Sequence, residues 1–530
     1  MWTDRASRCA ALWLLAAPAA AQEPLTAIDW LGATEGLPRT TALPQPDAAG
    51  ATQGSPVQPN EPPVADRVET PEITSAPLDA PSAEAVGLLP VSVTGLPRTL
   101  WSASETRDLL PKLNRIEADY AAISALLNTL LLAEADPPAT GSEGAPLLAA
   151  RIERLMRDGA LDPALALLDR SGLGAETLFD LWFDLALLTQ TEDAACTELE
   201  AKPSLSEALA PRIFCAARAG DWQRASLALA AGRETGTLSP RDADLLERFL
   251  DPELSEGLPP LPPPTDPTPL QFRLFEGIGE PLSTNRLGRA FAATDLDGDQ
   301  GWKAQLAAAE RLARAGTLAP NRFLGIYTER EPAASGGIWD RVEALQRFDT
   351  ALTARDPRSI AAALRRVWPE MRDAGLLSTF ATLYGPDLAG LPLDGPAKRM
   401  AQHAGLLSEE YETIAATSAP AGDAARFLFA VARGTDPGTP PPDLPHGASV
   451  QAGFDGTAET PPRIKTLAED GKLGEAILVT MLEFERGAAG DPGALSGALA
   501  AMRDLGLEDT ARRAALELVV TALEAREARR

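Results

Sequence analysis

Four helical segments of this chain are each followed by a glycine and, five positions after that glycine, by an alanine in a second helical segment. Glycine closes a helix readily because it adopts the left-handed backbone conformation without a steric penalty. A small residue on the inner face of the returning helix lets two antiparallel helices approach closely. The pattern therefore predicts helix hairpins, which turn at Gly159 before Ala164, Gly220 before Ala225, Gly471 before Ala476 and Gly506 before Ala511.

Composition and periodicity favour the same class. Alanine and leucine dominate and aromatic residues make up only 5% of the chain, a composition that loses little side-chain freedom in helices. Apolar residues recur at helical spacing and predict one long helix that opens at Ser104 and ends before Pro137; they are Leu109, Leu113, Ile116, Tyr120, Ile123 and Leu127. The apolar run at 121–133 is too short to span a bilayer and is expected as a buried helix.

The turn at residues 219–225 (AGDWQRA) carries a resemblance to a known repeat family. It is similar to tetratricopeptide repeats, which use a turn glycine and a small residue in the second helix. Gly471 and Gly506 lie 35 residues apart, near the repeat period of about 34. The resemblance to such αα-hairpin proteins of the bacterial periplasm implies an all-α fold, an irregular α-solenoid of antiparallel helix hairpins, that binds other chains.

Two proline-dense stretches interrupt the helical region, because proline cannot continue a helix. They occupy residues 256–269 and 435–457 and separate helical lobes at 100–255, 270–434 and 458–530. The last lobe is small, so we expect it to pack onto the middle one.

Residues 1–21 have the three parts of a secretory signal peptide. Arg5 and Arg8 make the start basic, residues 9–17 are apolar, and small residues lead to a cleavage site after Ala21. An uncleaved anchor or a buried core helix is the alternative. The pattern predicts export to the periplasm, and no later stretch of the sequence is expected to span a membrane.

Residues 22–99 are rich in proline and alanine and poor in large apolar side chains. Such a segment cannot bury enough apolar surface to offset its ordering entropy, so we expect a disordered tether that is semi-rigid because of its prolines. Within it, Ile28, Trp30 and Leu31 form an apolar cluster near the start of the mature chain. The cluster either binds a partner or folds back onto the helical body.

Cysteine content agrees with export. Cys9 belongs to the signal peptide, which leaves Cys196 and Cys215 as a pair. A pair in an oxidising compartment is a disulfide candidate, and facing helices would bring the two residues together. Two buried free thiols are the alternative.

Charge excludes one class of partner. The chain has 75 acidic and 48 basic residues and a net charge of −27, which repels nucleic-acid phosphates. Other proteins of the cell envelope are the expected partners, and no small-molecule ligand is expected.

Catalytic and metal-binding signals are sparse in the sequence. His403 and His446 are the two histidines and no Cys/His cluster accompanies them, so no zinc site, cofactor or catalytic residue is predicted. Asp295 and Asp297 begin a calcium-like pattern, but Gln300 replaces its glycine. Capping of the helix that follows is the simpler explanation.

These features predict an exported, non-enzymatic scaffold that mediates protein–protein interaction in the cell envelope. The alternative is a cell-wall-associated enzyme or accessory factor, since soluble lytic transglycosylases carry a similar helical superhelix. That similarity concerns architecture alone, because no stretch resembles their lysozyme-like catalytic domain.

Overall fold

The computed structural model describes residues 83–138, 145–172, 175–297 and 300–529. The chain divides into two units, Met1–Ala76 and Pro77–Arg530, and all described residues belong to the second. The predicted signal peptide, the cluster of Ile28, Trp30 and Leu31, and the predicted tether up to residue 82 therefore lie outside the described residues.

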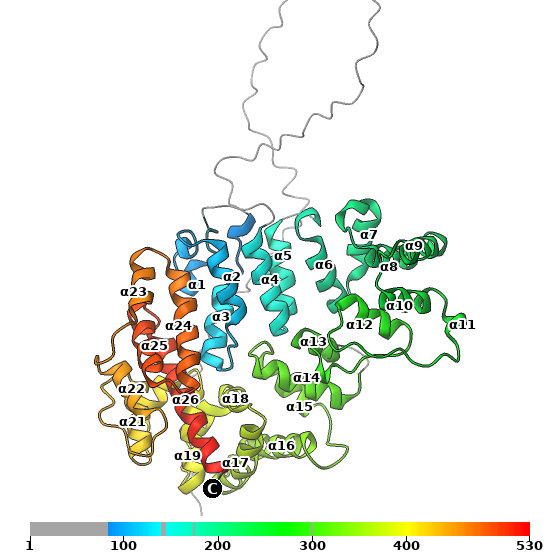
Figure 1. Cartoon of the computed structure of the whole chain (residues 1–530). Helices are drawn as coiled ribbons and strands as arrows, with labels where there is room; N and C mark the ends of the chain where they lie inside the picture. Colours follow the sequence, from blue (N-terminus) through cyan, green and yellow to red (C-terminus); the bar gives the residue numbers. More distant parts are fainter. Residues whose placement is uncertain (1–82, 139–144, 173–174, 298–299, 530) are drawn as a thin grey trace, which may run out of the picture. The chain divides into compact units, whose positions relative to one another are not determined.

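The described part of the chain is all-helical, and neighbouring helices pack in pairs (Figure 1). The first helices are α1 (Val91–Thr94), α2 (Thr106–Arg115), α3 (Ala121–Leu132), α4 (Pro146–Asp158), α5 (Leu161–Ser171), α6 (Ala175–Thr189), α7 (Glu192–Ala201), α8 (Leu209–Arg218) and α9 (Trp222–Thr235). The next are α10 (Pro240–Leu250), α11 (Pro252–Ser255), α12 (Pro269–Gly277), α13 (Arg289–Asp297), α14 (Trp302–Arg314), α15 (Pro320–Thr328), α16 (Ile338–Ala354), α17 (Pro357–Asp373) and α18 (Leu377–Ala389). The last are α19 (Gly395–Leu407), α20 (Tyr411–Thr417), α21 (Asp423–Ala432), α22 (Gly447–Phe454), α23 (Pro462–Glu469), α24 (Leu473–Ala488), α25 (Pro492–Asp504) and α26 (Glu508–Ala528).

Short 3-10 turns and one bridge complete the secondary structure. The 3-10 turns are Ala83–Ala85, Arg98–Leu100, Pro203–Leu205 and Thr284–Arg286. Within the described ranges, β structure is limited to an isolated parallel bridge between Leu89 and Ala133. None of the helices described is both long and apolar enough to cross a membrane.

The four predicted hairpin glycines lie between paired helices and have positive φ angles of 74° to 84°. Each alanine five positions later is fully buried, with an exposed fraction of 0%. Gly159 shows why a side chain is excluded: a Cβ there would meet the Leu312 side chain at 2.4 Å. Close approach of neighbouring elements therefore adds to the conformational reason for glycine.

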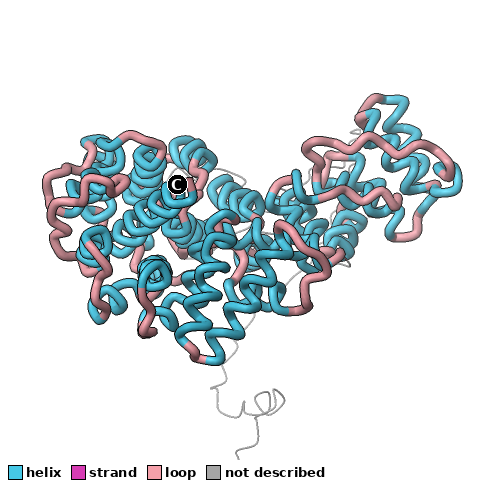
Figure 2. Tube along the Cα trace, turned by 90° about the horizontal axis from the view of Figure 1, so that it is seen from below, coloured by secondary structure: helices cyan, strands magenta, loops and turns pink. Residues whose placement is uncertain are grey.

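The largest apolar core joins two distant parts of the chain. It contains residues from the N-terminal helices, such as Leu109 and Ile123, together with residues of the C-terminal helices, such as Phe484 and Val519. Helix α24 packs against α2, and α26 packs against α3 (Figure 1). Figure 2, seen from below, shows that helices joined by loops make up the described part of the chain. The last predicted lobe therefore packs onto the middle lobe, at α17 and α19, and also covers the first helices, which we did not expect.

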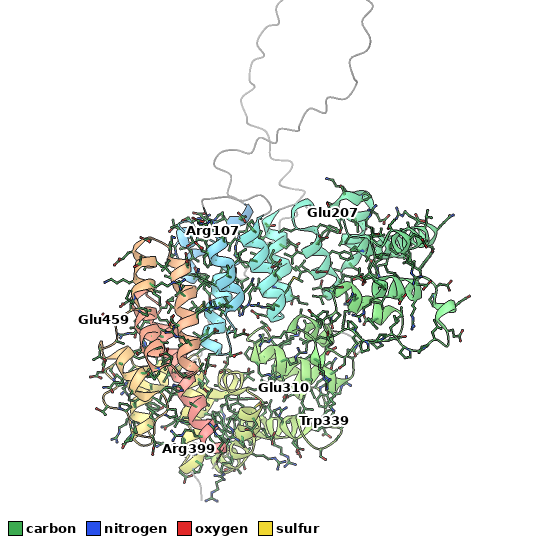
Figure 3. The ribbon with its side chains drawn as sticks, in the orientation of Figure 1. Arg107, Glu207, Glu310, Trp339, Arg399 and Glu459 are labelled. Carbon is green, nitrogen blue, oxygen red and sulfur yellow. A yellow bond between two sulfur atoms is a disulfide. The ribbon has the colours of Figure 1, made fainter. Side chains whose placement is uncertain are left out.

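Two further apolar cores are formed mainly by helices that lie, in sequence, between the N-terminal and C-terminal helices of the first core. One is built from helices α6 to α12 and includes Phe183, Phe214 and Phe275. The other is built from α13 to α19 and surrounds Trp368. In this last core the buried carboxylate of Glu310, labelled in Figure 3, accepts hydrogen bonds from Tyr327 at 2.6 Å and Arg341 at 2.7 Å.

Two predicted boundaries are wrong. The tether was expected to reach residue 99, but the segment from Ala83 onward packs on the helical body. Leu96 is buried, and the buried guanidinium of Arg151 donates from Nη1 to the carbonyl of Val86 at 3.0 Å. The stretch 435–457 was expected as a loop, yet it contains α22, whose Val450 is fully buried. In both places a few apolar side chains pack against distant parts of the chain, and the composition of the segment itself does not predict this packing.

The long helix predicted from Ser104 is also wrong, because the chain breaks between α2 and α3. Ala118 there has a φ of 57°. Glu485 of α24 accepts hydrogen bonds from the amides of Glu117 and Ala118 at 2.9 and 2.8 Å. Glu517 of α26 accepts those of Ala121 and Ala122 at 2.7 and 3.0 Å. Carboxylates from the C-terminal helices thus satisfy the amides at the start of α3.

Candidate functional site

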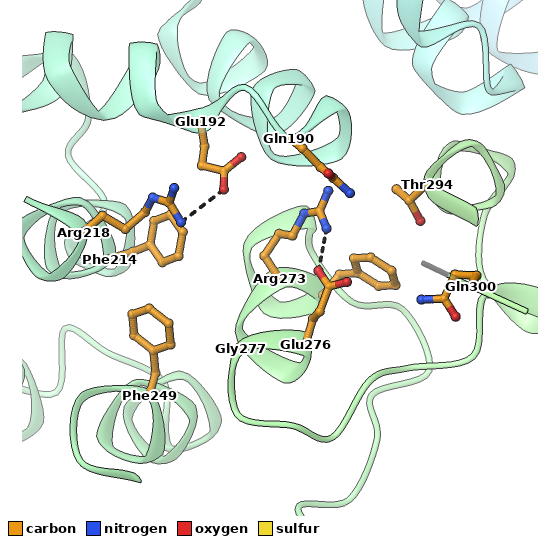
Figure 4. A pocket seen from close by; sticks show the side chains of 11 residues that line it. Gln190, Glu192, Phe214, Arg218, Phe249, Arg273, Glu276, Gly277, Thr294 and Gln300 are labelled. Atoms are coloured by element: carbon orange, nitrogen blue, oxygen red, sulfur yellow. Dashed lines mark hydrogen bonds and ion pairs between the residues drawn. The ribbon is translucent and has the colours of Figure 1, made fainter. Parts of the chain in front are cut away.

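The candidate site is a cavity of about 650 Å³ at the turn between α6 and α7. Helices α8, α10, α12 and α13 complete its walls, and Figure 4 shows it from close by. Three phenylalanines and two arginine–glutamate pairs line it. Its lining residues are Gln190, Glu192, Phe214, Arg218, Phe249, Phe272, Arg273, Glu276, Gly277, Thr294 and Gln300.

Helix α12 brings the central side chain into the cavity. It begins with a capping box, in which the Thr268 hydroxyl accepts from the Gln271 amide at 3.1 Å and the Gln271 side chain accepts from the Thr268 amide at 3.2 Å. Pro269 occupies the first turn, where its missing N–H has no cost. The side-chain nitrogen of Gln271 also donates to Asp242 of α10 at 2.8 Å. These contacts fix the start of α12 just before Phe272 and Arg273.

Arg273 is the most buried charged residue of the cavity, with an exposed fraction of 9%. Its Nε donates to the carbonyl of Leu187 at 2.6 Å, and its Nη1 pairs with Glu276 of the same helix. Its Nη2 is buried and has no hydrogen-bond partner among the described residues. In Figure 4 the guanidinium projects from α12 toward the turn that carries Gln190.

The opposite wall presents a buried acceptor. Glu192, at the start of α7, pairs with Nη1 of Arg218 at 3.3 Å, and its Oε2 is buried without a hydrogen-bond partner in the described structure. Gln190 lies two residues before Glu192 and has a φ of 60°. This backbone conformation is uncommon for a residue with a Cβ. Two residues of the cavity lining, Arg273 and Glu192, therefore each have one buried polar atom without a hydrogen-bond partner in the described structure.

Aromatic rings form the apolar part of the lining. The rings of Phe214 and Phe249 stack with their centroids 5.6 Å apart. The ring centroids of Phe272 and Phe291 are 5.0 Å apart. Gly277 allows the close approach of Phe249, because a Cβ at that position would lie 3.0 Å from its ring. Aromatic and charged groups together make a cavity suited to a ligand with an apolar part and a polar end.

The predicted disulfide is confirmed and joins two helices that contribute to the lining of this cavity. Cys196 of α7 and Cys215 of α8 are bonded and buried. The bond joins the helix that carries Glu192 to the helix that carries Phe214 and Arg218. A disulfide is compatible with an oxidising compartment.

The other predicted residues lie away from the cavity or outside the described part. Gly220 follows α8, whereas Gly159, Gly471 and Gly506 turn other helix pairs. The described residues contain no group of three or more potential metal ligands. Asp295 of the calcium-like pattern lies in the last turn of α13, where its carboxylate accepts a hydrogen bond from Thr284. Residues 298–299 are not described.

Sequence reasoning missed the cavity, although one signal for it was present. Arg273 interrupts the apolar run Phe272 to Phe275, directly after the capping-box pattern Thr268 to Gln271. A charged residue on the apolar face of a short helix needs a buried partner. Its partner carbonyl, on Leu187, belongs to another helix and could not be inferred.

A half-buried carboxyl with a shifted pKa, that of Asp184, lies on α6 outside the cavity lining. Burial, and then the charge of Asp180 one turn earlier, raise the pKa of Asp184 to about 7. A carboxyl of this kind can hold a proton at neutral pH.

No family model, curated protein or solved structure matches this chain. The chemistry of the site is therefore argued from its geometry. Both glutamates of the cavity are engaged by arginines in the free protein, which suits a binding role. A cavity with aromatic walls and a few charged groups is the usual form of a ligand-binding pocket.

Proposed function

We propose that this chain is an exported periplasmic scaffold, an irregular α-solenoid of helix hairpins that binds other proteins of the cell envelope. The signal-peptide pattern of residues 1–21 and the bond between Cys196 and Cys215 support the compartment. The observation that carries the binding role is the cavity itself, which three phenylalanines and two arginine–glutamate pairs line. Aromatic rings and charged groups give it both apolar and polar surface for a bound partner.

Photo-crosslinking in cells tests this function. The full chain would carry Gln190→p-benzoylphenylalanine, because Gln190 is exposed at the rim of the cavity. The matched control would carry the same residue at Asp387, which is exposed on α18. We expect one discrete envelope protein to be captured from the rim position and not from the control. Equal labelling at both positions, or none at the rim of an exported and oxidised chain, would contradict the proposal.

A second assay separates the scaffold from a cell-wall enzyme. Purified mature protein would be incubated with isolated cell wall, and soluble muropeptides would be measured. We expect no release above a heat-denatured control. Turnover of the cell wall would contradict a purely scaffolding role.

A further inference from the structure

The proline-rich segment between α11 and α12 is extended in the structure (Figure 1). Its residues 259–264 read PPLPPP, and none of them belongs to a helix, strand or turn. Proline fixes its own φ at about −65° and restricts the residue before it to extended backbone. Every residue from Pro259 to Pro264 is a proline or precedes one. These six positions, here called the proline ridge, therefore form a polyproline II helix.

Burial along the ridge follows the same geometry. A polyproline II helix has about three residues per turn, so every third residue lies on one edge. Leu261 is half-buried against the core of α6 to α12, and Pro264 and Pro267 are buried. The other prolines of the ridge are exposed, and they are Pro259, Pro260, Pro262 and Pro263. One edge of the ridge therefore rests on the helical body, and the two other edges are open to solvent.

Two side chains hold the ridge in place. Nη2 of Arg248, on α10, donates to the carbonyl of Pro259 at 2.9 Å. Glu280 accepts a hydrogen bond from the amide of Leu261 at 2.8 Å and pairs with Nη1 of Arg248 at 3.0 Å. Because the ridge is already ordered in the free protein, a partner that binds it has little conformational entropy to remove.

We propose that the proline ridge binds a partner protein whose groove is lined with aromatic side chains. The inference rests on the proposed scaffold function but concerns a surface outside the cavity lining. Such grooves accept polyproline II segments with the spacing Pro-x-x-Pro, which the exposed edges carry at Pro259 with Pro262 and at Pro260 with Pro263. A groove that contacts two edges of the helix leaves the third edge outside, and here the third edge is the one that rests on the body.

The surroundings of the ridge define the partner further. Leu258, directly before the ridge, is a large apolar side chain with an exposed fraction of 54%, which the same groove would cover. Glu256 and Asp266 lie on either side of the ridge and are exposed. The partner is therefore expected to carry basic residues at the rim of its groove.

The second proline-dense stretch of the chain is different and supplies a control. Pro440 and Pro441 are half-buried there, and the Leu444 amide donates to the carbonyl of Pro441 at 3.0 Å, which closes a turn. Pro442 is exposed but belongs to this turn and not to an extended ridge.

The experiment measures binding of the oxidised mature chain to isolated domains that take up polyproline II segments, namely an SH3, a WW and an EVH1 domain. Each domain is also made with lysines in place of the acidic residues at the rim of its groove, and biolayer interferometry gives the affinities. We expect the lysine-rimmed domains to bind. Replacing both prolines, Pro260→Ala and Pro263→Ala, should weaken that binding about tenfold or more. Pro442→Ala is the matched control and should leave the affinity unchanged.

The proposal is overturned if no lysine-rimmed domain binds. It is also overturned if binding is unchanged in the double variant, because the prolines of residues 22–82 would then account for it. Dimerisation of the natural chain that the double variant abolishes would assign the ridge to a second copy of this chain instead. Both substituted prolines are exposed, so an unchanged midpoint of thermal unfolding is expected and separates a lost contact from a lost fold.

This test and the test of the proposed function fail separately. Capture of a partner at Gln190 without domain binding at the ridge would overturn this inference and leave the scaffold function standing. Domain binding that depends on the ridge, without capture at Gln190, would contradict the proposed function and support the ridge as a binding surface.

Discussion

At the scale of single residues, Gly474 and Trp101 show how closely the two ends of the described chain meet. Trp101 is almost fully buried, and a Cβ on Gly474 would lie 2.4 Å from its ring and 2.8 Å from the carbonyl of Leu100. The N-terminal segment therefore rests directly on the backbone of α24. The packing of Trp101 on α24 therefore requires that residue 474 has no side chain.

Gly474→Ala is expected to destabilise the protein by about 1–3 kcal/mol, because the N-terminal segment must shift to make room. Urea denaturation followed by tryptophan fluorescence would measure the change. Gly493→Ala is the matched control, since Gly493 is also the second residue of its helix and the nearest atom to a Cβ there is 3.6 Å away. The control should be neutral or slightly stabilising. Equal destabilisation by both changes would contradict the steric explanation.

Asp184 leads to a prediction about pH. Burial and the neighbouring Asp180 raise its pKa to about 7 in the folded protein, compared with about 3.9 in an unfolded chain. The folded state therefore holds the proton between about pH 4 and 7, and the stability from this group falls as the pH rises through that window. Asp184→Asn removes the ionisable group, so the variant does not lose stability as the pH rises. It should be more stable than the natural protein at pH 8 by ~2–4 kcal/mol.

The measurement for Asp184 is the free energy of unfolding in urea at pH 4 and pH 8. We expect the advantage of Asp184→Asn to shrink toward zero at the lower pH. Asp387→Asn, on an exposed residue of α18, controls for the change in net charge. An advantage that stays constant between the two pH values would show that the asparagine acts through packing.

At the scale of elements, the break between α2 and α3 depends on carboxylates supplied by other helices. Glu485 accepts two backbone amides and Glu517 accepts two more. Burial raises the pKa of both groups, and the backbone hydrogen bonds act in the opposite direction. Arg154 acts on the other side of the same break, where its Nη1 donates to the carbonyls of Leu113 and Ile116 at 2.7 Å. The ends of both helices are thus satisfied by side chains from elsewhere.

Glu485→Ala is expected to cost about 1–3 kcal/mol, because it leaves the amides of Glu117 and Ala118 without their acceptor. Glu483→Ala removes a carboxylate two residues earlier on the same helix, which pairs with the exposed Arg486, and should cost less than about 0.5 kcal/mol. Thermal and urea unfolding of both variants would be compared. Hydrogen exchange should increase at Glu117 and Ala118 in the first variant, and unchanged protection there would argue against the capping role.

At the scale of the whole molecule, the C-terminal helices complete the core that the N-terminal helices begin. Besides the two glutamates, Glu475 of α24 pairs with Lys112 of α2 at 3.0 Å, and both side chains are largely buried. The first core therefore cannot form from either end of the described chain alone. This arrangement differs from an open repeat array, in which each repeat contacts only its neighbours.

Ending the chain after Ala458, and so deleting α23 to α26, is expected to unfold α2 and α3 as well. The first core would lose the apolar side chains of α24 to α26. Lys112 would lose its ion pair with Glu475. Limited proteolysis with mass spectrometry would locate early cleavage in residues 100–132. A truncated chain that keeps this segment protected and unfolds with an unchanged midpoint would contradict the prediction.

The helical class and the disulfide could be predicted from the sequence, and the reason is locality. Helix formation follows from residues three and four positions apart, and two remaining cysteines allow only one intramolecular pairing. The break after α2 and the cavity could not be predicted, because the atoms that decide them are distant in sequence. Glu485 acts on an amide 368 positions away, and the cavity is lined by residues between Gln190 and Gln300 that come from several helices. By itself the sequence determined which segments become helices. Only the tertiary structure decided where they end and which side chains line a cavity, because hydrogen-bond partners and burial are properties of the packed chain.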